Sequence, residues 1–232
     1  MIDVRPFDSL GQFDIDWLKA RHHFSFGHYM DRNRMGFGAL RVWNDDTIQP
    51  DTGFDPHPHR DMEIITYVRR GAITHRDRLG NEGRTEAGDV QVMSAGTGIV
   101  HAEYNLEPDI TQIFQIWIEP SAPGFEPRWD SRSFPKGDRA GELIVLASGR
   151  PQDKDALRIN QDAAVFGATL QAGQSVTHPI GAGRKVYLVA ATGAITVDGV
   201  PVAARDGVAV ADQETITIVA TDTAEIVLVD VP

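Results

Sequence analysis

The 232-residue chain contains no cysteine. This absence excludes disulfide bonds, thiolate metal ligands and catalytic thiols. A metal ion in this protein would therefore have to be held by imidazole and carboxylate groups. A chain without cysteine is compatible with a reducing compartment, and its first residues show no basic start followed by an apolar segment. We therefore expect no signal peptide and a cytoplasmic protein.

Long hydrophobic runs and clustered positive charge are also missing. No segment approaches the ~20 consecutive apolar residues that cross a bilayer, so we expect no membrane partner. The 22 Lys and Arg residues are outnumbered by 33 Asp and Glu residues, which gives a net charge of −11. Nucleic-acid binding depends on clustered basic residues, and the densest point here is only Arg69-Arg70. We expect no direct nucleic-acid binding, whereas a protein partner stays open.

Histidine is nearly absent from the second half of the chain, where only His178 occurs. The remaining histidines all lie within the first 101 residues: His22, His23, His28, His57, His59, His75 and His101. This distribution predicts that any histidine-based site belongs to the N-terminal half.

Most of the chain has the pattern of short β-strands. Apolar, β-branched runs such as Met62–Val68, Ile110–Ile118 and Val186–Ala191 are separated by turn residues, and Asp198-Gly199 is typical of a two-residue hairpin. Helices are expected to be few, at Ile15–Ala20 and Gln161–Ala164. Because strands do not alternate with helices, the pattern favours an all-β sandwich or barrel.

The length permits one large domain or two small ones. The segment Pro120–Gly141 is rich in Pro, Gly and charge, and is expected to be a linker or a crossing between domains. Gly71-Ala72-Ile73-Thr74 is echoed by Gly193-Ala194-Ile195-Thr196. The echo marks either two similar domains or a chance coincidence.

Two segments combine histidine with a carboxylate: His57-Pro58-His59 and His101-Ala102-Glu103. Residues two apart on a strand point to the same face. Two such strands facing each other across a narrow barrel would bring three imidazoles and one carboxylate together, a donor set that binds divalent metals. An H-x-H pair in a loop is also common as ordinary surface polarity, and that alternative stays open on spacing alone.

The surrounding residues resemble the pirin family of the cupin superfamily. The resemblance rests on His57-Pro58-His59-Arg60 with Glu63, and on the run Met93-Ser94-Ala95-Gly96-Thr97-Gly98-Ile99-Val100-His101-Ala102-Glu103. Ser94 stands where the common cupin motif has Pro, and the approach through Thr97–Val100 is longer than usual. The segments Arg21–Gly27 and Phe37–Val42 are similar to bacterial, quercetinase-like pirins. The resemblance is strong over residues 1–128 and only architectural over 129–232.

The resemblance implies an all-β bicupin fold, with two double-stranded β-helix domains of jelly-roll type. Residues 1–128 would form a metal-binding cupin domain, and residues 129–232 a degenerate cupin domain without metal. The implied ligands are His57, His59, His101 and Glu103, holding one divalent metal. Fe(II) is the first choice, with Ni, Mn, Cu and Zn open. Glu63 would share a face with His59 if the strand were regular, but Glu103 is favoured as the ligand.

The remaining histidines are less specific. His22, His23 and His28 either line the mouth of the site or are partly buried polar residues. His75 is expected on an exposed strand face.

The resemblance implies a mononuclear metal-dependent dioxygenase that cleaves flavonols such as quercetin with O2 and releases CO. Glu103 would act as the general base for the flavonol hydroxyl. The alternative is a metal- and redox-dependent regulatory protein that acts through a protein partner without turnover. A zinc-dependent cupin isomerase is a weaker third interpretation.

Overall fold

The computed structural model describes residues 1–232 and divides into two compact units. The N-terminal unit comprises Gly11–Phe134 and Leu157–Gln161. The C-terminal unit comprises Met1–Leu10, Pro135–Ala156 and Asp162–Pro232. The units are thus interleaved in sequence, which differs from a single division between residues 128 and 129.

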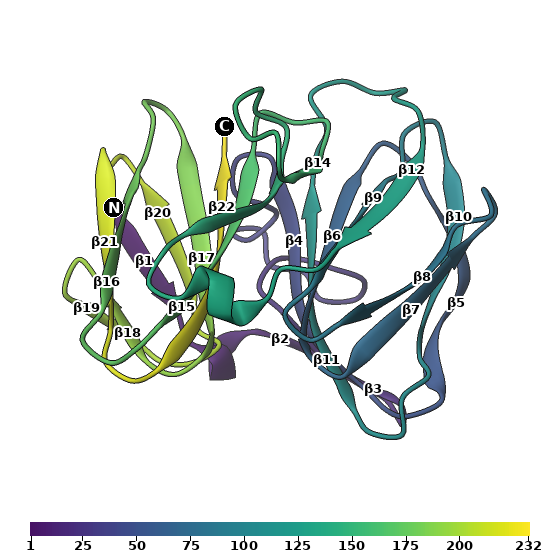
Figure 1. Ribbon diagram of the computed structural model, residues 1–232, viewed down its shortest axis with the longest axis horizontal. Coiled ribbons are helices and arrows are strands. Elements are labelled where there is room, and N and C mark those ends of the chain that lie inside the picture. Colours follow the sequence, from purple (N-terminus) through teal and green to yellow (C-terminus); the bar gives the residue numbers. More distant parts are fainter. The chain divides into compact units, whose positions relative to one another are not determined.

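The N-terminal unit contains two antiparallel sheets (Figure 1). Across the first sheet the strands follow the order β12 (Arg128–Arg132), β9 (Val90–Ser94), β6 (Glu63–Arg70), β11 (Thr111–Ile118), β4 (Leu40–Ile48), β3 (Leu18–His22) and β2 (Gly11–Asp14). The second sheet has the order β5 (Thr52–His59), β10 (Ile99–Asn105), β7 (Ala72–Asp77) and β8 (Glu82–Glu86). The short strand β14 (Leu157–Arg158) also falls within the residues of this unit.

The C-terminal unit repeats this architecture. Its first sheet has the order β1 (Ile2–Arg5), β20 (Gly207–Ala211), β17 (Lys185–Thr192), β22 (Ala224–Val231), β15 (Ala164–Leu170) and β13 (Ile144–Ser148). Its second sheet has the order β16 (Ser175–Pro179), β21 (Thr215–Ala220), β18 (Ile195–Val197) and β19 (Val200–Val202). Two sheets of this kind in each unit confirm the predicted all-β, bicupin fold.

Helices are confined to two short 3-10 turns, η1 (Phe7–Ser9) and η2 (Lys136–Arg139). Neither has the length and apolar character needed to cross a membrane. The helix expected at Gln161–Ala164 is wrong, because Ala164 begins β15. The helix expected at Ile15–Ala20 is also wrong, because Leu18–His22 forms strand β3. Its alternating burial has the period of two that a strand imposes. Pro120–Gly141 contains the boundary between the two units at Phe134–Pro135, which fits the expected crossing between domains, and it also supplies β12 and η2.

Two glycines explain the echo in the sequence. Gly71 precedes β7 and Gly193 precedes β18, with φ angles of +73° and +71°. A Cβ atom at Gly71 would lie 2.6 Å from Oγ1 of Thr111, and one at Gly193 would lie 2.3 Å from the carbonyl oxygen of Thr223. Both positions require the left-handed conformation and a close approach that favour glycine. The echo therefore marks equivalent turns in two similar domains.

The first strand of the chain belongs to the C-terminal unit. Ile2 and Val4 of β1 pair with Val210 and Val208 of β20, which completes one edge of that sheet (Figure 1). This pairing is why residues 1–10 group with the second half of the chain. The predicted hairpin is confirmed in the same unit: Asp198 and Gly199 have φ angles of +47° and +81° and join β18 to β19.

The interior of the C-terminal unit is filled by aliphatic side chains. Strand β22 is buried along its whole length, and β21 alternates between buried and more exposed positions. The side chains of these strands, of β15, β17 and β20, and of their neighbours form one continuous hydrophobic cluster. Each fully buried Val, Leu or Ile side chain contributes on the order of 1.5–3 kcal/mol to folding. This unit therefore has a core that is stabilised by packing.

Candidate metal centre

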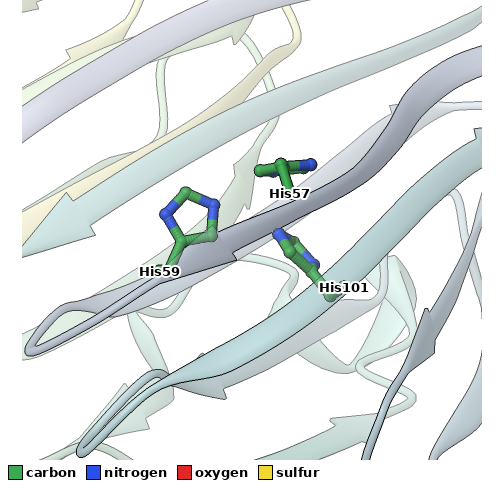
Figure 2. A group of neighbouring side chains, drawn as sticks. All are labelled: His57, His59 and His101. Atoms are coloured by element: carbon green, nitrogen blue, oxygen red, sulfur yellow. The ribbon is translucent and has the colours of Figure 1, made fainter.

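Three imidazoles meet on the second sheet of the N-terminal unit. His57 and His59 extend from β5 and His101 from β10, and their side chains point toward one another (Figure 2). The ring centroids of His57 and His101 are 4.5 Å apart, and those of His59 and His101 are 5.0 Å apart. One ring nitrogen from each residue lies within 4.8 Å of the others. The structure thus brings these three side chains together.

The strand arrangement that brings the three histidines together differs from the expected arrangement. The sequence predicted two strands facing each other across a barrel. In the structure β5 and β10 are hydrogen-bonded neighbours, and His57 is paired directly with His101. A bulge follows, so that Glu103 is paired with Phe54. Adjacent pairing brings the two motifs together without requiring the barrel to be narrow.

The environment keeps two of these imidazoles neutral. Burial, with a smaller contribution from His57, lowers the pKa of His59 to about 4. Burial and the neighbouring rings of His57, His59 and His75 lower the pKa of His101 to about 2. Near pH 7 both rings therefore keep a nitrogen lone pair, which metal ligation requires.

A hydrogen-bond relay fixes which nitrogen of His101 carries that lone pair. Nε2 of His75 is 3.0 Å from Oδ2 of Asp77, and the Nδ1 atoms of His75 and His101 are 3.4 Å apart. If His75 donates its Nε2–H to Asp77, its Nδ1 must accept from the Nδ1–H of His101. The lone pair of His101 is then on Nε2, an atom that is buried and has no hydrogen-bond partner.

The surroundings of Asp77 keep its carboxyl group ionised, so that it can accept a hydrogen bond from His75. Burial raises the pKa of Asp77, but hydrogen bonds from His75 and Asn81 outweigh burial and keep the pKa below its ordinary value. An ionised Asp77 is a strong acceptor for the His75 ring. Relays of this type orient metal-ligating histidines in proteins.

The expected exposure of His75 is wrong. Its side chain is 0% exposed, and its ring stacks on Trp129 with centroids 4.9 Å apart and an interplanar angle of 8°. On β7 the buried Ile73 and His75 alternate with the more exposed Thr74 and Arg76. This alternation was the sequence signal that points His75 inward.

His57 has an equally defined tautomer. Its Nδ1 lies 2.7 Å from the carbonyl oxygen of Asp55, which can only accept a hydrogen bond. The ring therefore donates its Nδ1–H, which leaves Nε2 as the nitrogen that can ligate a metal. The carboxylate of Asp55 is in turn hydrogen-bonded by the hydroxyl of Tyr104.

Glu103 lies beside the histidines in a polar environment that sequence reasoning missed. The amide of Gln91 donates to its Oε1 at 2.6 Å, and the amide of Gln115 donates to its Oε2 at 2.8 Å. A ligating oxygen of Glu103 lies within 4.8 Å of ring nitrogens of His75 and His101. Burial raises the pKa of Glu103, and the neighbouring His75 and His57 oppose this effect. Gln91 and Gln115 come from the opposite sheet, so only the tertiary structure reveals them.

Glu63 lies in a different environment from the histidines. Its carboxylate accepts hydrogen bonds from Oγ of Ser94 at 2.6 Å and from the amide of Asn160 at 2.9 Å. Glu63 begins β6, whereas His59 ends β5, and Asp61 between them has a φ angle of +47°. The two residues therefore do not share one regular strand. Ser94, which departs from the common cupin motif, has a defined role as the donor to Glu63.

A cavity of about 730 Å³ opens beside His57 and His59, whereas His101 is not among its lining residues. Its volume falls in the range typical of small-molecule sites. His57, His59 and Glu103 line it, and so do His22 and His28. His23 is fully buried against Trp43 and is not part of the lining. The aromatic lining residues are Phe13, Trp17, Phe26, Tyr29, Phe54 and Trp117.

The residues present fit a divalent metal. They provide neutral imidazoles on His59 and His101, one buried nitrogen without a partner on His101, and a carboxylate on Glu103, which groups with His101 and His75 and not with His57 and His59. Such nitrogen and oxygen donors bind borderline divalent ions. The cavity beside them leaves room for a ligand.

His178, the single histidine of the second half, has a different environment. It lies in the C-terminal unit, where its Nε2 is 2.8 Å from Oδ2 of Asp230. Arg150 and Arg184 form ion pairs with Oδ1 of the same carboxylate. Burial raises the pKa of Asp230, but the hydrogen bonds from His178 and Arg184 hold it below its ordinary value.

The paired sheets of each unit define the class of this protein as a bicupin with a candidate metal centre in the N-terminal unit. Residues 3–118 match the family Pirin, and residues 145–231 match the Quercetinase C-terminal cupin domain. The chain belongs to the pirin family. The predicted resemblance is thereby confirmed, and it extends over the second half.

Similar proteins agree with this assignment. A Pirin-like protein of Caulobacter vibrioides is 64% identical over 205 residues, which are 88% of each chain. A Quercetin 2,3-dioxygenase of Escherichia coli strain K12 is 42% identical over 204 residues, covering 86% of this chain and 85% of the relative. The crystal structure of the bacterial pirin YhhW in complex with nickel(II) from Escherichia coli superposes with a TM-score of 0.94. That structure is 39% identical and covers 100% of this chain and 99% of its own.

Proposed function

We propose that this protein is a mononuclear metal-dependent dioxygenase that cleaves flavonols such as quercetin with O2 and releases CO. The observation that carries the proposal is the cluster of half-buried His57 and His59 with buried His101, whose Nε2 has no hydrogen-bond partner, beside a cavity of about 730 Å³ with several aromatic lining residues. The similarity to a Quercetin 2,3-dioxygenase supports the choice of substrate.

His57, His59, His101 and Glu103 would hold one divalent metal per chain. Fe(II) is our first choice, with Ni, Mn, Cu and Zn open, and the relative YhhW was crystallised in complex with nickel(II). When bound, the metal supplies Lewis-acid polarisation of a substrate oxygen and a route for electron transfer between the flavonol and O2.

The protein residues bind the flavonol and accept its proton. The aromatic walls of the cavity, including Trp17, Phe54 and Trp117, would hold the flat rings and exclude water. Glu103 would accept the proton of the flavonol 3-hydroxyl, because it is the carboxylate that lines the cavity next to the histidines. The amides of Gln91 and Gln115 hold both of its oxygens in place.

The reaction balances with one O2 per flavonol. The two carbon–carbon bonds to the hydroxyl-bearing carbon break, and that carbon leaves as CO. Both oxygen atoms of O2 remain in the ring-opened carboxylated ester. No external reductant is required.

The first test is CO release from quercetin in air by Fe(II)-loaded protein, with Glu103→Gln measured beside it. We expect release from the wild type and a loss of at least about 100-fold in the variant, the range of a missing general base. Metal content by mass spectrometry should be about one ion per chain. No CO from metal-loaded wild type would refute flavonol cleavage.

Two further variants locate the site. His101→Ala should lose the metal because it removes the buried ligand, whereas His178→Ala should retain it because that ring is bonded to Asp230. The opposite pattern would place the metal in the C-terminal unit.

The other interpretations stay predictions. A partner interaction that changes with the oxidation state of the metal, without turnover, would favour the regulatory alternative. The cytoplasmic location and the lack of nucleic-acid binding are likewise expectations.

A further inference from the structure

Three polar side chains on neighbouring strands form a track in the lining of the cavity. Asn44 and Asp46 lie two residues apart on β4, so both point to the same face, and both line the cavity. Gln115 on β11 is paired with Asn44 and also lines the cavity. Because Gln115 donates to Glu103, the track connects β4 to the candidate metal centre.

Asp46 is the member of this track that protein contacts do not satisfy. Its side chain is buried, with 2% exposure of the residue, and its Oδ1 has no hydrogen-bond partner. Its paired residues on the neighbouring strands are Ala20 and Ile113, which offer no polar side chain. The adjacent Asp45, by contrast, forms an ion pair with Arg69.

An unsatisfied buried carboxyl group destabilises the folded state. Such groups are rare in folded proteins and require an explanation. Packing does not explain a carboxyl group at this position, because an aliphatic side chain would suit the neighbours Ala20 and Ile113 better. The position of Asp46 in the lining of a ligand-sized cavity does explain it.

The protonation state of Asp46 fits a role in ligand binding. Burial raises its pKa well above the ordinary value, and the nearby carboxylates of Asp45 and Glu103 add to this effect, whereas Arg69 opposes it. A neutral carboxyl group donates one hydrogen bond and accepts others.

We propose that Asp46 binds a hydroxyl group of the aromatic ligand at a point separate from the oxygen held at the metal centre. The site would therefore select polyhydroxylated over hydroxyl-poor flavonols. A site built to bond a substrate hydroxyl discriminates strongly against analogues that lack it, since its own polar group is then left unpaired. The choice of flavonol ligands rests on the proposed function.

The test is anaerobic binding of quercetin and of 3-hydroxyflavone, which lacks the additional ring hydroxyls, to metal-loaded protein. Trp17 and Trp117 line the cavity, so quenching of their fluorescence reports occupancy. We expect Asp46→Leu to weaken quercetin binding about tenfold, the loss of one hydrogen bond. The affinity for 3-hydroxyflavone should stay within about twofold in the same variant.

Other variants separate recognition from structure. Asp46→Asn should keep the preference for quercetin, because an amide also donates and accepts hydrogen bonds. Asp222→Leu makes the same change at an exposed position of the C-terminal unit and should alter neither affinity. Without ligand, Asp46→Leu should raise the melting temperature by about 2–4 °C. If Asp46→Leu does not fold, Asp46→Ala provides the same comparison with a smaller side chain.

The outcomes distinguish this inference from the proposed function. An unchanged preference in Asp46→Leu, or an equal loss for both ligands, would overturn the role of Asp46 even if CO release is observed. A preference that depends on Asp46, without CO release, would support the binding role and refute flavonol cleavage. Failure of both flavonols to bind the wild type would overturn both proposals.

Discussion

His101 shows how a protein can determine the chemistry of one ring nitrogen through two residues behind it. When a neutral His75 donates to Asp77, its Nδ1 accepts from His101, which puts the lone pair of His101 on its buried Nε2. Without this relay the ring could adopt the other tautomer, whose Nε2 carries a proton and does not ligate.

Replacing His75 by Phe should therefore weaken metal binding about 10- to 100-fold, the usual effect of removing a partner of a ligating histidine. Phenylalanine keeps the aromatic contact with Trp129 but cannot accept from His101. His75→Gln is the matched control, because its amide oxygen can accept that hydrogen bond. The measurement is competition with a chelating dye, and equal affinities for wild type and His75→Phe would contradict the relay.

Acidification should destabilise the metal-free protein through the same cluster. The pKa of His59 is about 4 in the folded protein against a usual value of 6.5, so the unfolded chain binds its proton first. The stabilisation is fully present above about pH 6.5 and is lost as the pH falls toward 4, and the pKa of His101, about 2, extends the loss further.

Denaturant unfolding of metal-free protein between pH 7.5 and 4.5 measures this effect. His59→Gln removes one of the groups and should reduce the pH dependence over this range. A variant with the same pH dependence as the wild type would show that His59 does not titrate as described. Metal should also be released on acidification, because its ligands must be neutral.

At the scale of elements, the pairing of β5 with β10 determines the geometry of the site. Gly53 on β5 lies against β10 so closely that a Cβ atom there would be 2.2 Å from the carbonyl oxygen of Glu103 and 2.6 Å from Cα of Tyr104. Its backbone is in a region open to all residues, so the restriction is steric. Glycine is needed here so that His57 and His101 can be brought into register.

Gly53→Ala should therefore cost about 1–3 kcal/mol of unfolding free energy, as for other insertions into a packed site. It should also reduce metal affinity, because it forces β5 away from β10. Gly137→Ala is the control, since a Cβ atom there has no heavy atom within 4 Å. Denaturation and metal titration of both variants provide the test, and unchanged stability in Gly53→Ala would refute the steric argument.

At the scale of the whole molecule, the two units share the two-sheet architecture but differ in what fills the interior. The C-terminal unit fills its interior with aliphatic side chains, whereas the N-terminal unit has a cavity with histidines and carboxyl groups in its lining. Polar groups and empty volume both weaken a core. The N-terminal unit therefore has the arrangement expected where a ligand site is maintained at the expense of packing.

Strand β1, the first strand of the chain, should stabilise the C-terminal unit to which it belongs. Deletion of Met1–Pro6 removes β1 and leaves β20 as an unprotected edge. We expect a lower melting temperature and more aggregation, with about one metal per chain still bound at 25 °C because the candidate ligands all lie in the N-terminal unit. Calorimetry and metal analysis test this, and an unchanged melting temperature would show that β1 contributes little.

The fold class and the candidate ligand motifs could be predicted from the amino-acid sequence alone. Period-two alternation, turn residues such as Asp198-Gly199 and the short motifs His57-Pro58-His59 and His101-Ala102-Glu103 are local features, and local features are visible in one chain. The prediction of a helix at Ile15–Ala20 was wrong because a short segment has too few residues to distinguish the period of a helix from that of a strand.

The pairing of the strands, and with it the environment of the site, could not be predicted from the sequence. The relay from Asp77 through His75, the amides that hold Glu103, and the unsatisfied carboxyl group of Asp46 all depend on contacts between residues distant in sequence. Each of these side chains is unremarkable where it stands in the chain. Its chemistry arises from burial and from partners that strand pairing supplies, because desolvation and hydrogen bonding act through space.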